Sequence, residues 1–166
     1  MRTRVVMIVA LLLTAIAVGG VQATADDGKR FSARPSGYEE VPALSVAGRG
    51  TFSAELSPAG DSVSFSLRYS GLTGDAAVAH IHLGQPAVAA GVIAFLCGGG
   101  GQPACPTGTS ATITGTIDAA KVVGPAAQGI APGEFAEFVA AMQAGVTYVN
   151  VHTAAFPAGE IRGQIR

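Results

Sequence analysis

The chain has 166 residues, of which 10 are Lys or Arg and 11 are Asp or Glu, so its formal net charge is only −1. The Lys and Arg residues form no cluster, which argues against nucleic acid and anionic membrane surfaces as partners. The 23 glycines and 9 prolines, with few charged residues and no Trp, are typical of short strands joined by tight turns.

The N-terminus has the pattern of a secretory signal peptide. Two arginines precede a largely apolar run from Val5 to Val18, and the small residues Ala23-Thr24-Ala25 form an A-x-A cleavage site. The run is shorter than the roughly 20 apolar residues of a membrane-spanning helix, and no later segment is long and apolar enough to be one. We therefore predict a signal peptide at 1–25 and a secreted or periplasmic mature domain at 26–166 without a membrane span. The alternative is a leader that stays uncleaved as an anchor.

The first half of the mature domain predicts short strands. The segment 31–44 is at most an extended edge segment, because its two prolines cannot donate to a strand ladder. Apolar and polar residues then alternate with period two in 50–56 and again in 62–69. Between them, Pro58-Ala59-Gly60-Asp61 supplies a turn, so these two segments predict a β-hairpin.

Strand-like segments continue to the C-terminus, interrupted by one helix. The helix is predicted over 132–143, where apolar residues recur at helical spacing: Phe135, Phe138, Val139 and Met142. The remaining strand-like segments are 78–83, 91–97, 110–117, 147–153 and 159–165. This order predicts an all-β fold, an antiparallel Greek-key sandwich or partly closed barrel of about seven or eight strands with one short helix.

Two cysteines, Cys97 and Cys105, bracket a loop that contains four consecutive glycines. In an exported chain the first expectation is a disulfide bond between them. Closing so short a loop stabilises the fold by about 2.5 kcal/mol in the chain-entropy picture. The spacing of eight, with no basic neighbour, does not favour a redox or metal-binding pair.

The last two strand-like segments are predicted to pair as an antiparallel hairpin. In 147–153, Val149 and Val151 point to the core, and the polar positions point the opposite way. Taken with the second strand, the residues on this outer face are Tyr148, Asn150, His152, Glu160, Arg162 and Gln164. The sequence thus predicts one exposed polar face that carries a histidine beside several hydrogen-bonding side chains.

The chain contains only three histidines, His80, His82 and His152. In a strand, His80 and His82 project to the same face with Cα atoms about 6.5 to 7 Å apart, so both imidazoles can reach one ion. Pairing of the two histidine-bearing strands would bring all three rings together. We therefore hypothesise a shared metal site. The alternative is a structural polar cluster of the histidines with Asn150, Glu160 and Arg162.

Three motifs resemble the CHRD domain family. They are Tyr38-Glu39-Glu40-Val41-Pro42, Ala79-His80-Ile81-His82-Leu83-Gly84, and the C-terminal stretch formed by 148–153 and 156–164. The resemblance covers nearly the whole mature chain. It implies an all-β, immunoglobulin-like or barrel-like fold. In chordin such domains belong to an extracellular antagonist of growth factors, an activity that nothing in this short chain supports.

The histidine pattern is also similar to a reduced copy of the copper site in Cu/Zn superoxide dismutase. The fourth, bridging histidine and the zinc ligands are missing, so we expect neither dismutase activity nor catalytic residues. Three neutral imidazoles with an open position suit copper or zinc. Because histidine titrates near pH 6.5, binding is expected to weaken toward pH 5. We place four residues around the ligands: Tyr148, Asn150, Glu160 and Arg162.

The alternative function is that of an extracellular binding module. Two loops, 84–90 and 97–105, would contact a protein or polysaccharide partner, since binding residues often lie on loops held by a rigid scaffold. The histidines would then be structural. The sequence contains no GxSxG, HExxH or phosphate-loop motif that would point to another enzyme class.

Overall fold

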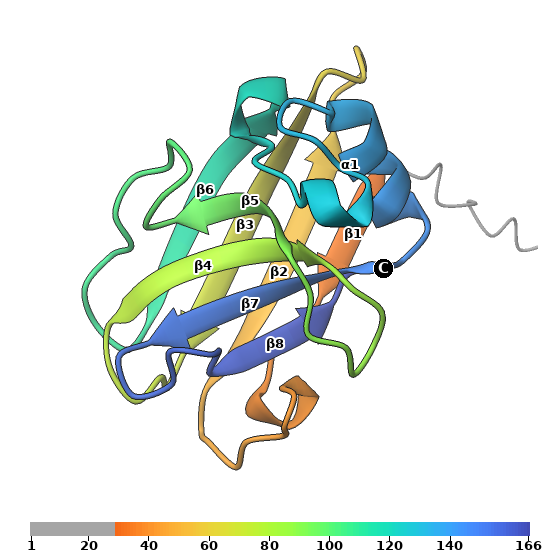
Figure 1. Ribbon diagram of the computed structural model, residues 1–166. Coiled ribbons are helices and arrows are strands. Elements are labelled where there is room, and N and C mark those ends of the chain that lie inside the picture. The colour runs from red at the N-terminus through yellow and green to blue at the C-terminus, as the bar shows by residue number, and fades with distance from the viewer. Residues whose placement is uncertain (1–28) are drawn as a thin grey trace, which may run out of the picture.

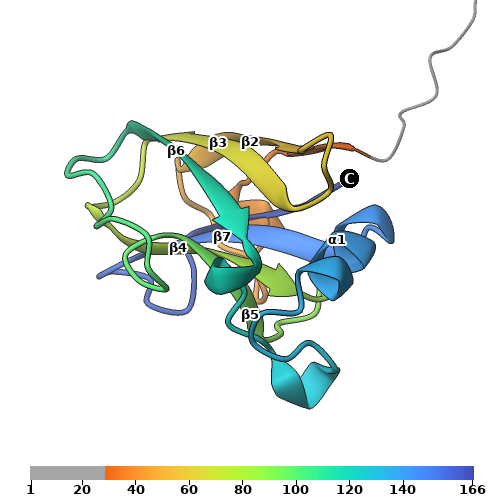
Figure 2. The same cartoon turned by 90° about the horizontal axis from the view of Figure 1, so that it is seen from above.

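The computed structural model describes residues 29–166, so the predicted signal peptide at 1–25 lies outside the described residues. Within 29–166, eight strands form two four-stranded antiparallel sheets that pack as a sandwich (Figures 1 and 2). The first sheet has the order β1-β2-β3-β6 and the second has the order β5-β4-β7-β8. The predicted sandwich is confirmed, and the sheets do not close into a barrel.

The strands match the predicted segments closely, with one addition at the start. The addition is β1, which pairs with β2 although its segment was expected to be at most extended. The strands are β1 (Arg30–Ala33), β2 (Arg49–Leu56), β3 (Ser62–Ser70), β4 (Ala76–Leu83), β5 (Val92–Cys97), β6 (Ala111–Asp118), β7 (Thr147–Thr153) and β8 (Ile161–Gln164). Both predicted hairpins, β2 with β3 and β7 with β8, are present.

The core lies between the two sheets and follows from the period-two alternation. In β3 the apolar positions are all buried: Val63, Phe65, Leu67 and Tyr69. The second sheet faces them with Ile81, Val149, Val151 and Ile161, none of which is exposed at all. Each such side chain stabilises the fold by about 1.5 to 3 kcal/mol when it leaves water. A shift of either sheet by one residue would expose its whole apolar set, so the register is fixed.

The α-helix of the described residues, α1 (Phe135–Gln143), covers one end of the sandwich (Figures 1 and 2). It begins three residues later than predicted, because Gly133 adopts a positive φ of 87° and Phe135 N donates to the Gly133 carbonyl. Short 3-10 helices are η1 (Gly37–Glu39), η2 (Ala119–Lys121) and η3 (Ala126–Gln128). None of the helices in the described part of the chain has the length and apolar character that a membrane crossing requires.

Cys97 and Cys105 form the predicted disulfide, which ties the end of β5 to the loop that follows it. Gly98 N donates a 2.7 Å hydrogen bond to the Pro103 carbonyl inside this loop. Gly98 has a φ of +79°, and a Cβ on it would lie 2.5 Å from the Ala77 carbonyl oxygen. This turn beside β4 therefore requires glycine.

Candidate metal centre

The three histidines lie on the outer face of the second sheet, on its two central strands. β4 carries His80 and His82, and β7 carries His152. The antiparallel register places His80 opposite Asn150 and His82 opposite Tyr148, so these residues share one face with His152. Strand pairing thus brings together residues that are 72 positions apart in the sequence.

The rings converge closely enough to share one ion. One ring nitrogen from each of His80, His82 and His152 lies within 4.8 Å of the other two. The ring centroids are 4.9 Å apart for His80 and His152, and 5.2 Å apart for His80 and His82. A tetrahedral ion with bonds of roughly 2.0 to 2.1 Å needs nitrogens roughly 3.4 Å apart, so the rings must rotate for all three to bind one ion. The predicted convergence of the three histidines is confirmed.

Backbone carbonyls orient two of the three imidazoles. His82 Nδ1 lies 2.8 Å from the carbonyl oxygen of Ala90, and His152 Nδ1 lies 3.1 Å from that of Pro157. A carbonyl only accepts, so each neutral ring carries its proton on Nδ1 and presents a lone pair on Nε2. His80 Nδ1 then donates to His152 Nε2 over 3.2 Å. Carbonyl hydrogen bonds of this kind orient histidine ligands in metal sites.

The lone pair of His82 Nε2 has no hydrogen-bond partner in residues 29–166, although the atom is buried. An unpaired buried acceptor costs about 1 to 3 kcal/mol, so it is rarely retained without a use. The donor set is therefore suited to a metal. It consists of the unpaired Nε2 of His82, the Nε2 of His152, which accepts from His80 in the absence of an ion, and the imidazole of His80.

The histidine face is buried, which the alternation of polar and apolar residues does not predict. All seven residues of β7 are buried, and the three histidines are only 7 to 9 % exposed. The loops after β4 and β7 pack onto this face, and each places a carbonyl against a ring. The prediction of an exposed polar face is therefore wrong, because strand periodicity contains no information about loops that fold back over a sheet.

Burial keeps the three imidazoles neutral. It lowers the pKa of His80 to about 3, and the neighbouring rings of His152 and His82 add to this shift. It also lowers the pKa of His82 to about 4, against the opposing effect of the Ala90 carbonyl. The pKa of His152 is lowered as well, again by burial. Neutral imidazole is the form that binds metal ions.

Two aromatic side chains enclose the histidine rings. Tyr148 lies parallel to His82, with ring centroids 4.6 Å apart. Its Oη accepts a 3.1 Å hydrogen bond from Ala90 N, so Tyr148 also positions the residue whose carbonyl orients His82. Phe95 of β5 meets His80 edge to face at 4.5 Å. Tyr148 therefore contacts a candidate ligand and fixes the loop above it.

Arg162 and Asn150 lie on the same face and connect it to the surrounding loops. The Arg162 guanidinium carbon lies 3.5 Å from the centre of the Tyr148 ring, and Nη2 donates to the Gln85 carbonyl over 2.9 Å. Asn150 Nδ2 donates to Glu40 Oε1 over 2.5 Å. Burial raises the pKa of Glu40, while the hydrogen bond from Asn150 and the charge of Arg162 oppose the rise.

Glu160 has a different set of contacts from the one expected beside the histidines. The residue is fully buried just before β8. Thr73 N donates to Oε1 over 2.8 Å, and Oε2 accepts from the hydroxyls of Thr73 at 2.9 Å and Thr153 at 2.6 Å. These bonds tie the loop between β3 and β4 to the end of β7.

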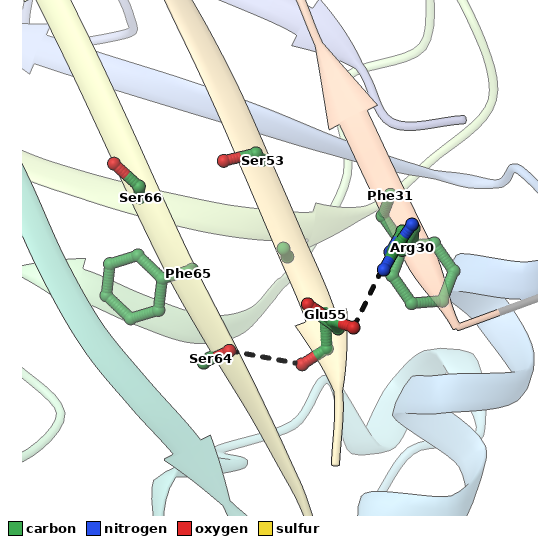
Figure 3. Close-up of a pocket in the computed structure, with 8 residues that line it drawn as sticks. Arg30, Phe31, Ser53, Glu55, Ser64, Phe65 and Ser66 are labelled. Carbon is green, nitrogen blue, oxygen red and sulfur yellow. Dashed lines mark hydrogen bonds and ion pairs between the residues drawn. The ribbon is translucent and has the colours of Figure 1, made fainter. Parts of the chain in front are cut away.

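A pocket on the other sheet lacks comparable chemistry (Figure 3). It is lined by Arg30, Phe31, Ser53, Ala54, Glu55, Ser64, Phe65 and Ser66. Arg30 Nε lies 3.5 Å from Glu55 Oε1, and both side chains are largely exposed, so this pair contributes at most about 1 kcal/mol. Among the residues that the structure describes, the one group of three or more His, Cys, Asp or Glu side chains placed to hold a metal ion is that of the three histidines.

A sequence model of the CHRD domain matches residues 31–165, which is nearly all of the described chain. The chain belongs to the CHRD domain family. The resemblance seen in the sequence motifs is thus confirmed, and the CHRD match contains all three histidines and both sheets. Comparisons with curated proteins and with solved structures gave no match.

Sequence reasoning found the CHRD histidines but missed the groups that orient them. Ala90 and Pro157 act through their carbonyls, which no side-chain pattern reveals. Glu40 lies in the CHRD motif at 38–42, and the motif does not reveal that its carboxylate accepts from Asn150. The sequence places Phe95 in a strand but does not reveal its contact with His80.

Proposed function

We propose that this CHRD domain is a metal-binding module that holds one copper or zinc ion through His80, His82 and His152. The observation that carries the proposal is the unpaired, buried Nε2 of His82, which lies in a group of three imidazoles within 4.8 Å of one another. The orienting carbonyls of Ala90 and Pro157 support it, because they hold the ring protons of His82 and His152 on Nδ1 and so place a lone pair on each Nε2. The lone pair of His82 is unpaired, and that of His152 accepts from His80 Nδ1. Three neutral nitrogen donors with an open position suit zinc and copper.

The proposed function is metal binding and does not include dismutase activity. The set lacks the fourth, bridging histidine and the zinc ligands of the dismutase pattern, and the chain has no further histidine to supply them. Tyr148 and the two carbonyls then serve to hold the imidazoles in place, and Arg162 and Asn150 hold the loops that enclose them.

The experiment is a titration of the purified, metal-free protein with copper and with zinc, followed by calorimetry and by metal analysis after desalting. We expect one equivalent to be retained by the wild-type protein and the affinity to fall at least about tenfold in a His82→Ala variant. A Ser53→Ala variant, altered on the exposed face of the other sheet, is the matched control and should bind like the wild type. Equally weak binding by the wild type and His82→Ala would exclude the site.

We also propose that the domain acts outside the cytoplasm, after cleavage at Ala25. The support is the N-terminal leader pattern together with a disulfide, a bond that persists mainly in oxidising compartments. N-terminal sequencing of protein recovered from the periplasm or culture medium tests this, with Asp26 expected as the first residue. Recovery of the intact chain from the cytoplasm would contradict it.

Capture of an extracellular protein or polysaccharide remains the second candidate function. The supporting observation is Val88, which is 45 % exposed in the loop between β4 and β5. A Val88→Ser variant should lose partner capture under this proposal, and a His82→Ala variant should retain it. The reverse pattern would favour the metal-binding function.

A further inference from the structure

The candidate ligand set contains no negatively charged group. Within residues 29–166 it consists of His80, His82 and His152, all buried. The two cysteines of the chain are joined in a disulfide, so neither offers a thiolate. Because an imidazole binds as a neutral ligand, an ion in this site keeps its full charge in a buried environment.

A buried positive charge lies close to the same site. The Arg162 guanidinium carbon is 3.5 Å from the Tyr148 ring centre, and the Tyr148 and His82 ring centres are 4.6 Å apart. Arg162 therefore lies no further than about 8 Å from the His82 ring, and it is only 3 % exposed. Water screens such a buried charge weakly.

The nearby carboxylates are engaged elsewhere. Glu160 accepts from Thr73 and Thr153, and Glu40 accepts from Asn150. Neither carboxylate forms a hydrogen bond with a histidine among the described residues. An ion bound by the three imidazoles is thus not paired directly with a carboxylate, and the buried Arg162 guanidinium places a like charge nearby.

We propose that the three-histidine site selects a monovalent soft cation, Cu(I), over divalent ions such as Zn²⁺ and Cu²⁺. This inference rests on the metal-binding function proposed above. The cost of moving an ion out of water grows with the square of its charge, so a divalent ion pays about four times the penalty of a monovalent one. Three nitrogen donors satisfy Cu(I), whereas Zn²⁺ requires a fourth ligand. Only an anionic fourth ligand would reduce the net charge of the bound Zn²⁺.

Arg162 provides a test of the charge effect in particular. At roughly 9 Å and an effective dielectric constant of about 20, one unit charge on Arg162 weakens binding about 20-fold for each unit charge on the ion. Loss of the Arg162 contacts to Tyr148 and Gln85 affects both ions alike, whereas loss of the charge favours Zn²⁺ over Cu(I). Arg162→Gln should therefore lower the ratio of Cu(I) to Zn²⁺ affinity about 20-fold. Arg162→Lys keeps the charge and should keep the ratio.

The measurements are anaerobic competition for Cu(I) with bicinchoninate and competition for Zn²⁺ with a chromophoric chelator, both at pH 7 on the purified protein. A ratio unchanged in Arg162→Gln relative to Arg162→Lys would overturn the inference and leave the metal-binding function intact. Failure of the wild type to bind either ion would overturn both. Thermal unfolding of each metal-free variant checks that it is folded.

Anions give a second readout that does not depend on a variant. Added azide should strengthen Zn²⁺ binding to the wild-type protein, because an anionic fourth ligand offsets the second charge. The same addition should leave Cu(I) binding unchanged. Zn²⁺ binding that is indifferent to azide would overturn the inference even where Arg162→Gln does not fold.

Discussion

The imidazole of His82 and the phenol of Tyr148 lie parallel at 4.6 Å, and both hydrogen-bond to Ala90. Tyr148 Oη accepts from the Ala90 amide, and the Ala90 carbonyl accepts from His82 Nδ1. The loop after β4 is thus held at Ala90 by two hydrogen bonds, one to its amide and one to its carbonyl. The tautomer of His82, and with it the free lone pair on Nε2, depends on the placement of that loop.

Replacement of Tyr148 by Phe should weaken metal binding without removing a ligand. The variant keeps the ring stacked on His82 but leaves the Ala90 amide without its acceptor, which costs about 1 kcal/mol of stability. With the loop loosened, we expect the affinity for the ion to fall about tenfold. Calorimetric titration and thermal unfolding measure the two effects. Tyr38→Phe, at a residue that is 73 % exposed, is the control and should change neither.

The sequence was sufficient to predict the strands and the convergence of the histidines. In β4 and β7 the apolar positions fix which face is buried in the core, so the parity of His80, His82 and His152 follows. The three histidines then meet because β4 and β7 are neighbours in the sheet. Odd and even positions of a strand lie on opposite faces, and a shift of one residue would move every side chain to the other face. The position of each histidine relative to the apolar residues therefore determines its face.

The same parity rule did not predict the surroundings of the site. It placed Glu160 with the histidines, but this residue precedes β8, and its hydrogen bonds go to Thr73 and Thr153. It also predicted an exposed face, whereas loops bring Ala90 and Pro157 onto the rings. The alternation of residues predicts which face of the sheet a side chain occupies. It does not predict which loops, distant in the sequence, pack against that face.

The folded, metal-free protein should lose stability as the pH falls from about 6.5 to about 4. The pKa of His80 is lowered to about 3 and that of His82 to about 4, so over this range the unfolded chain binds protons that the folded chain does not. Each such histidine contributes a slope of up to about 1.4 kcal/mol per pH unit. Urea unfolding at several pH values measures the slope. A His82→Gln variant should show a shallower one, and an unchanged slope would contradict this assignment.

Metal binding should persist at a lower pH than ordinary histidines allow. A ligand with a pKa of 6.5 loses about 30-fold in affinity at pH 5 because protons compete for it. His80 and His82 are essentially unprotonated at pH 5. Protons therefore do not compete for them at this pH, and the roughly 30-fold loss of metal affinity does not apply. The weakening that the sequence predicts between pH 6.5 and pH 5 is therefore expected to begin only near pH 4. Titrations at pH 7 and pH 5 should give affinities within about tenfold of each other, and a loss of about 1000-fold would contradict this.

Removal of the disulfide should destabilise the domain without disturbing the metal centre. The bond closes a short loop at the end of β5, so a Cys97→Ser, Cys105→Ser double variant should lose about 2.5 kcal/mol. The loop is separate from the carbonyls that orient the histidines, so the affinity for the ion should remain unchanged. Urea unfolding and calorimetric titration of the double variant check both expectations. A large fall in metal affinity would show that the loop supports the site.

Glu160 should be a structural residue whose loss leaves metal binding intact in the folded protein. Its carboxylate accepts hydrogen bonds from Thr73 N, from the Thr73 hydroxyl and from the Thr153 hydroxyl. A Glu160→Ala variant would leave three donors without their charged acceptor in the interior, which should cost about 3 kcal/mol or more. Glu137→Ala, on the exposed side of α1, is the matched control and should cost less than about 0.5 kcal/mol. Unfolding by urea measures both costs, and titration of the folded fraction measures the affinity. If Glu160→Ala binds the ion more weakly while remaining folded, the carboxylate acts on the histidines after all, through Thr153 and its neighbour His152.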